Sequence, residues 1–112
     1  MSQRIEKINE IIRQQLGQFI IKEIEMPPNC LVTITSVETS ADIRYCKVFI
    51  TVLPENMRGT ALEILQKNSL LLHNLLKGSL STKFVPNLKF QIDEQEVFAA
   101  KVDKILDEIK KG

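Results

Sequence analysis

Side chains that could carry out acid–base, nucleophilic or metal chemistry are few in this chain of 112 residues. His73 is the only histidine, and its neighbours are mostly leucines rather than further metal ligands. The two cysteines, Cys30 and Cys46, do not have the short Cys–His spacing of a zinc site. A reducing cytosol would keep both thiols free, and we expect them to pack as small apolar side chains.

Acidic residues and glycines form no catalytic pattern either. Asp42 could converge with Asp93 or Glu94, but turn and cap roles account for each acid separately. The glycines are isolated, so there is no glycine-rich phosphate loop. We therefore predict that the chain is not an enzyme and uses no cofactor, metal or small-molecule substrate. A hydrolytic or metal-dependent enzyme built around His73 is the alternative.

Basic residues show a clearer pattern. No acid occurs between Ile64 and Ile92, in a chain whose net charge is only +1. This segment contains four lysines: Lys67, Lys77, Lys83 and Lys89. Such a local excess of positive charge indicates a binding surface for a polyanion. The other interpretation is a solvated face that arose by chance.

These residues must be positioned by helices and strands. Isoleucine, leucine and phenylalanine recur at three- and four-residue steps over residues 2–24, which predicts a helix that Ser2 could cap and that the Pro27-Pro28 pair ends. Gly17 within it indicates either a small loss of stability or a close packing contact.

Two strands are predicted next, over residues 31–39 and 45–53, joined in an antiparallel hairpin that turns near Ala41–Asp42. Val37 is out of phase with the preceding alternation, which indicates a β-bulge or a change of face. This register would place Cys46 opposite Val37 and Cys30 opposite Leu53, too far apart for a disulfide.

A helical pattern covers residues 58–77 and is interrupted at 67–69, with Gly78 expected just after its end. A third strand is predicted over residues 87–93 and a final helix over 94–111. The chain is therefore predicted to be a single α+β domain, residues 1–112, with the order α-β-β-α-α-β plus a C-terminal helix. No apolar run is long enough to cross a bilayer and the N-terminus has no signal sequence, which predicts a cytoplasmic protein without membrane contact.

The break at Lys67-Asn68-Ser69 has a possible function. KH modules pack two helices against a three-stranded sheet, and the short loop between the helices clamps a nucleic-acid backbone. The N–H groups at the start of the second helix favour phosphate, and Lys67 adds charge. An ordinary helical kink would produce the same pattern.

Two separated segments resemble one protein family. Residues 32–50, VTITSVETSADIRYCKVFI, are similar to the hairpin of the ribosome-binding factor A family, in which Val-x-x-Ser-x-Asp-Leu precedes Ala-x-Val-aromatic. Residues 83–93, KFVPNLKFQID, resemble the basic-x-x-Pro-x-Leu-x-Phe-x-x-Asp segment of the same family. Arg4, the junction at Pro27 and the leucine-rich tandem helices also follow in the expected order.

The resemblance implies a type II KH-like fold and a monomeric bacterial assembly factor. Such a factor binds the immature small (30S) ribosomal subunit and its 16S rRNA and assists late maturation and rRNA processing. The family usually carries Ala-x-Gly at the helical kink, where this chain has Asn68-Ser69-Leu70, and asparagine tolerates the left-handed region. This chain stops at Gly112 without the basic tail that many members of the family carry, and its modest net charge predicts weaker non-specific RNA affinity.

We expect RNA contacts from the basic residues and the kink. The expected contacts are Arg4, Lys7, Arg44, Lys67, Asn68, Ser69, Lys77, Lys83 and Lys89. With few aromatic residues, base stacking should contribute little. The main alternative is a small α+β protein-interaction or regulatory module without an RNA ligand.

Overall fold

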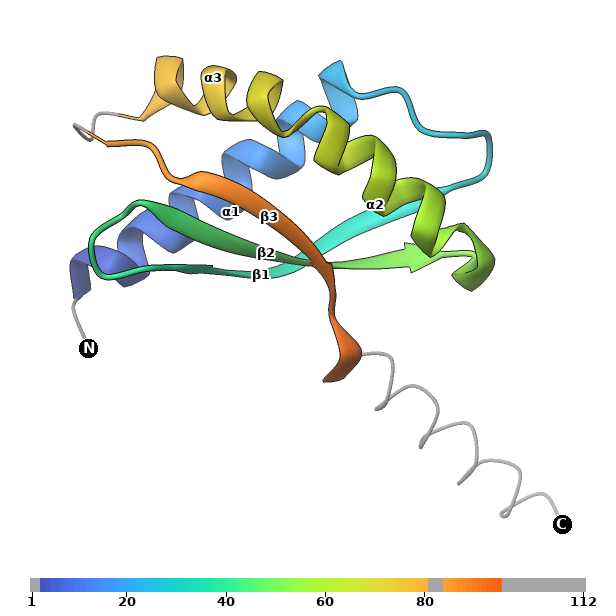
Figure 1. The fold of residues 1–112 in the computed structure, drawn as a ribbon, viewed down its shortest axis with the longest axis horizontal. Coiled ribbons are helices and arrows are strands. Elements are labelled where there is room, and N and C mark those ends of the chain that lie inside the picture. The colour runs from blue at the N-terminus through green and yellow to red at the C-terminus, as the bar shows by residue number, and fades with distance from the viewer. Residues whose placement is uncertain (1–2, 81–83, 96–112) are drawn as a thin grey trace, which may run out of the picture.

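A computed structural model describes residues 3–80 and 84–95, and Figure 1 shows how its elements are arranged. The α+β class and the predicted α-β-β-α-α-β order are confirmed. Beyond Gln95, the predicted C-terminal helix lies outside the described residues, as does Ser2. The elements are α1 (Gln3–Glu23), β1 (Leu31–Thr39), β2 (Tyr45–Leu53), a 3₁₀ turn (Glu55–Met57), α2 (Arg58–Lys67), α3 (Ser69–Ser79) and β3 (Asn87–Ile92).

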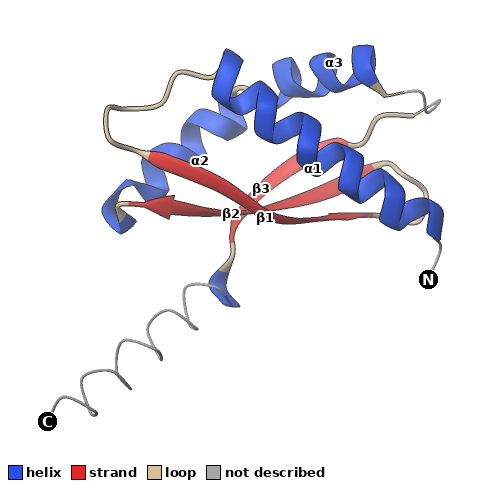
Figure 2. Ribbon diagram, turned by 180° about the vertical axis from the view of Figure 1, so that it is seen from behind, coloured by secondary structure: helices blue, strands red, loops and turns tan. Residues whose placement is uncertain are grey.

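The described part of the chain has two layers, because α1, α2 and α3 lie on one face of the sheet (Figures 1 and 2). The strand order is β1-β2-β3, with β1 antiparallel and β3 parallel to β2. Alternate residues of β2 are buried beneath the helices, whereas their neighbours face the other side. The face of the sheet away from the helices is therefore open to solvent over much of β2 and β3.

The core forms where the helices meet the sheet. On α1, four buried residues recur at every fourth position, so they line one side of the helix: Ile8, Ile12, Leu16 and Ile20. Leu65 of α2 and Leu72 and Leu76 of α3 are fully buried against the same cluster. Burial of each such side chain contributes roughly 1.5–3 kcal/mol, which fixes the helices on the sheet.

The β1–β2 hairpin contains the predicted bulge, but its register differs from the prediction. Ile34 pairs with Ile50, whereas Ser36 pairs with Phe49, so one extra residue of β1 is accommodated there. Cys46 lies opposite Thr39, which means that its predicted placement opposite Val37 was wrong. The cause is Ile43, which adopts a left-handed conformation (φ 60°) and shifts the centre of the turn by one residue.

The cysteines are free thiols at opposite ends of this hairpin, as predicted. Cys46 is buried in the core, and Cys30 is partly buried against it, one residue before the Leu31–Leu53 pair. Cys30 is therefore one position out from its predicted place opposite Leu53. Burial raises the pKa of the Cys46 thiol, so this group is a poor nucleophile.

The predicted helix end at Gly78 was also wrong. Helix α3 continues to Ser79, and the Leu80 N–H still donates to the Leu76 carbonyl at 2.8 Å. Gly78 has no positive φ angle, so it does not act as a left-handed cap. Among the helices of residues 3–80, none is long and apolar enough to span a membrane.

Candidate nucleic-acid interface

The break between α2 and α3 is centred on Asn68, as the sequence predicts. Its side-chain amide donates to the Ile64 carbonyl at 2.8 Å, so it completes the end of α2 and does not cap α3. The backbone of Asn68 has φ −98° and ψ 10°, which shows that the kink forms without a left-handed residue. The first turn of α3 starts at Ser69, where N–H groups lack carbonyl partners within their own helix. This corner can therefore attract an anion.

Lys67 lies at this corner and pairs with Glu63. The ammonium group is 3.2 Å from the carboxylate, and both side chains are about two-thirds or more exposed. An exposed i,i+4 pair of this kind is worth only ~0.3–0.5 kcal/mol, so a phosphate could replace Glu63 as the partner of Lys67. The acid-free segment recognised in the sequence thus begins directly beside an acid that partly balances its first lysine.

Four of the predicted contacts belong to elements at one end of the molecule. The N-terminus of α1, the β1–β2 turn and the C-terminal end of α3 lie at this end (Figures 1 and 2). These elements carry the exposed residues Arg4 and Lys7 (α1), Arg44 (turn) and Lys77 (α3). The Asn87 N–H donates to the Arg44 carbonyl at 2.8 Å, which holds the turn against the start of β3.

Asp42 and Arg44 account for the charge at this turn. The Ser40 hydroxyl donates to the Asp42 carboxylate at 2.6 Å, and the Arg44 N–H donates to the same oxygen at 3.1 Å. These hydrogen bonds, with a smaller contribution from the Arg44 guanidinium, lower the pKa of Asp42. Asp42 is thus a turn-forming residue, and its charge partly balances that of Arg44.

Lys89 lies on the open face of the sheet. It alternates along β3 with Leu88 and Phe90, which are buried beneath the helices. The side chain of Lys89 therefore points away from the layer that carries Lys67 and Lys77. The structure brings Lys67, Asn68 and Ser69 together at the corner and separates them from Lys89; Lys83 lies outside the described residues.

Two residues that the sequence analysis did not select lie beside Lys89. Lys47 is the direct cross-strand neighbour of Lys89, and Tyr45 lies opposite Asn87. Tyr45 is 63% exposed. The period-two alternation of β2 is the sequence signal that places Tyr45 and Lys47 on one face, but their position beside Lys89 requires the parallel β2–β3 register.

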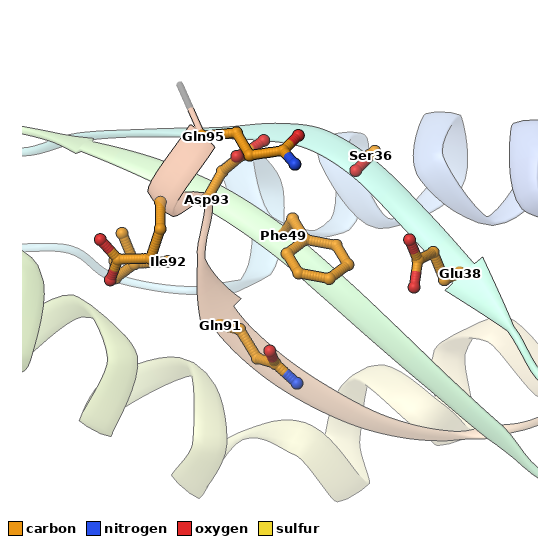
Figure 3. Close-up of a pocket in the computed structure, with 8 residues that line it drawn as sticks. Ser36, Glu38, Phe49, Gln91, Ile92, Asp93 and Gln95 are labelled. Carbon is orange, nitrogen blue, oxygen red and sulfur yellow. The ribbon is translucent and has the colours of Figure 1, made fainter. Parts of the chain in front are cut away.

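The same open face has a hollow where the chain leaves β3. Figure 3 shows Phe49, Gln91 and Glu38 around it, with Asp93 at one side. The Thr35 hydroxyl lies 2.6 Å from the Asp93 carboxylate, which draws the end of β3 toward the bulge of β1. The acids Asp93 and Glu94 make this end of the face less suited to a polyanion than the end at Lys47 and Lys89. Glu38 also lines this hollow, and it lies opposite Lys47 on β1.

His73 has a structural contact. Its Nδ1 lies 3.0 Å from the Pro86 carbonyl, so a proton on Nδ1 links α3 to the segment before β3. Within residues 3–80 and 84–95, no three His, Cys, Asp or Glu side chains gather in a way that could hold a metal ion. The contact at Pro86 explains the position of His73 without catalysis.

Comparison with known proteins places the chain in a family. The model of the ribosome-binding factor A family matches residues 4–106, which is nearly the whole sequence. The chain belongs to the ribosome-binding factor A family. A ribosome-binding factor A from Bdellovibrio bacteriovorus is 32% identical over 108 residues, covering 96% of this chain and 81% of the relative.

Solved structures of ribosome-binding factor A share the fold. The crystal structure of the Thermus thermophilus protein aligns with a TM-score of 0.69 at 20% identity, covering 79% of this chain and 93% of the other. A homology model of the Thermus thermophilus protein, fitted into a cryo-EM map of a complex of ribosome-binding factor A with the 30S subunit, aligns with a TM-score of 0.64 at 21% identity, covering 74% of this chain and 88% of the other. The fold of this chain is therefore that of the ribosome-binding factor A structures.

Proposed function

We propose that this chain is a cytoplasmic ribosome-binding factor that binds the immature 30S subunit and its 16S rRNA as a monomeric single domain. It would assist late maturation and rRNA processing without being an enzyme and without a cofactor. The family match over residues 4–106 carries this proposal. The Thermus protein of the same fold that was fitted into a 30S complex supports the choice of partner.

The geometry supports a binding function through the corner between α2 and α3. This corner combines the start of a helix with Lys67, whose ion-pair partner Glu63 is exposed and weakly held. Leu70, at the same corner, is 70% exposed, which suits contact with an apolar part of the particle. Arg4, Lys7, Arg44 and Lys77, which lie at one end of the molecule, would add further phosphate contacts, and so would Lys83.

The factor would act by differential affinity rather than by turnover. If it binds one conformation of the unfinished rRNA more tightly than another, it shifts the population toward the first by that difference in free energy. Recognition of RNA shape and backbone would suffice, because phosphate contacts fix position without reading sequence.

Co-sedimentation with purified 30S subunits at increasing salt tests the proposal. The wild type should bind, and a Lys67→Ala/Lys77→Ala variant should bind roughly ten-fold more weakly at low salt, with a shallower salt dependence because two phosphate contacts are lost. An Arg13→Ala/Lys22→Ala variant removes two exposed charges from α1 and should bind like the wild type. A folded wild-type protein that ignores 30S subunits at low salt would instead indicate a protein-interaction module.

A further inference from the structure

We propose that the open face of the sheet is a second RNA-binding surface, which holds single-stranded RNA with a base stacked on Tyr45 and phosphate between Lys47 and Lys89. This surface lies on the opposite side of the sheet from the α2–α3 corner. The inference rests on the proposed function only in taking RNA as the ligand.

The two lysines form a pair prepared for an anion. Lys47 and Lys89 are direct neighbours in the parallel β2–β3 register, and both are exposed. Neighbouring strands lie about 4.8 Å apart, so the two lysine side chains project from the sheet side by side. Like charges in this arrangement repel each other, and a phosphate between them would replace this repulsion by two attractions.

Tyr45 provides an exposed ring next to this pair. Its backbone is fixed on both sides by Ser40, since the Tyr45 N–H donates to the Ser40 hydroxyl at 3.1 Å and the Ser40 N–H donates to the Tyr45 carbonyl at 2.8 Å. A ring attached to a rigid backbone loses little conformational freedom when a base stacks on it. Stacking accepts every base, because each has a π-face, and Asn87 opposite Tyr45 could bond a base edge.

The surroundings favour a single strand. Tyr45 and Lys47 line two hollows, one together with Gln66, Asn87 and Lys89 and the other together with Glu38, Thr39 and Ser40. A strand crossing the ring could place neighbouring nucleotides in both hollows. A duplex cannot, because its bases are already stacked within the helix.

Glu38 limits the affinity of this surface. It lies opposite Lys47 on β1, so the row formed by Glu38, Lys47 and Lys89 has a net charge of only one positive unit. Removal of this acid should therefore strengthen binding.

Intrinsic fluorescence tests the proposal directly, because the chain has one tyrosine and no tryptophan, so that the signal reports Tyr45 alone. Titration with a single-stranded oligouridine 10-mer should quench it in a saturable manner, while a duplex RNA of equal length should quench it much less. Labelled-RNA anisotropy should show roughly ten-fold weaker binding for Tyr45→Leu and for Lys47→Gln/Lys89→Gln, and tighter binding for Glu38→Gln. Circular dichroism would verify that each variant is folded.

The control is Arg13→Gln/Lys22→Gln, which removes the same charge from α1 and should leave the titration unchanged. Absence of quenching, equal quenching by the duplex, or equal losses in the control would overturn the inference. A protein that shows no quenching but still co-sediments with 30S subunits through Lys67 would refute this surface and leave the proposed function standing. Quenching of Tyr45 by the single strand without binding to 30S subunits would support this surface and refute the proposed function.

Discussion

The side-chain amide oxygen of Asn9 on α1 accepts two hydrogen bonds from Thr39 at the end of β1. The Thr39 N–H donates at 3.0 Å and the Thr39 hydroxyl at 2.5 Å. This contact joins the first helix to the last residue of the strand that runs into the hairpin turn. It therefore helps to set the position of the end of the molecule at which Arg44 lies.

Replacement of Asn9 should destabilise the protein, because both donors of Thr39 lose a partly buried acceptor. We expect Asn9→Ala to lower the free energy of unfolding by about 1–2 kcal/mol in urea denaturation. Gln14→Ala, an exposed substitution on the same helix, should change it by less than about 0.5 kcal/mol. Equal effects of the two substitutions would show that the Asn9 contact contributes nothing.

Gly17 should be replaceable by alanine with a gain in stability. A Cβ atom built at Gly17 meets nothing within 4 Å, and the residue lies inside α1. Alanine lowers the entropy of the unfolded chain, so Gly17→Ala should raise the free energy of unfolding by about 0.5–1 kcal/mol in the same assay. A loss of stability would mean that the close packing contact considered for this glycine exists after all.

The lowered pKa of Asp42 should contribute measurably to the dependence of stability on pH in the acid range. Because this pKa is lowered in the folded protein, its stabilising contribution is present above the unfolded value of about 3.9 and is lost as the pH falls through the folded value. The stability difference between the wild type and Asp42→Asn should therefore shrink on acidification. In an NMR titration, Ser40→Ala should raise the pKa of Asp42, since the Ser40 hydroxyl is the largest cause of the shift. An unchanged pKa would contradict this assignment.

Ile43 combines a strained backbone with a buried side chain. Its φ of 60° is unusual for a β-branched residue, and only 6% of the residue is exposed. Ile43→Leu retains the apolar volume and removes the β-branch, so we expect unchanged or slightly higher thermal stability. Ile50→Leu, in the regular part of β2, should instead lose up to about 1.5 kcal/mol. A larger loss at position 43 than at position 50 would show that strain at Ile43 is negligible.

Much of the described fold could be predicted from periodicity, because apolar spacing located helices α1 to α3 and strands β1 to β3 to within one or two residues. The out-of-phase position of Val37 also indicated an irregularity in β1, which is a bulge in the structure. The register of the hairpin could not be predicted, because Ile43 looks like a strand residue and yet belongs to the turn. The predicted helix end at Gly78 was wrong for a related reason, since glycine permits a left-handed cap without requiring one.

The candidate interface was predictable in part. The corner at Asn68 could be predicted, because polar residues interrupt a leucine-rich pattern there. The single positive surface expected from the acid-free segment is not what the structure shows. Lys89 alternates with buried residues of β3, and the covering helices lie on the other side of the sheet. The importance of Lys47 depended on strand pairing between distant segments, which spacing along the chain does not reveal.

The parallel pairing of β3 with β2 affects how the protein forms during its own synthesis. The β1–β2 hairpin can form as soon as it leaves the ribosome, but β2 gains its second neighbour only after both intervening helices have been made. Until then, one edge of β2 has no partner strand, and Leu88 and Phe90 are missing from the core. A nascent chain that pauses before residue 87 would therefore be a partly folded intermediate that is prone to aggregation. The addition of β3 to the sheet is the step that removes this tendency.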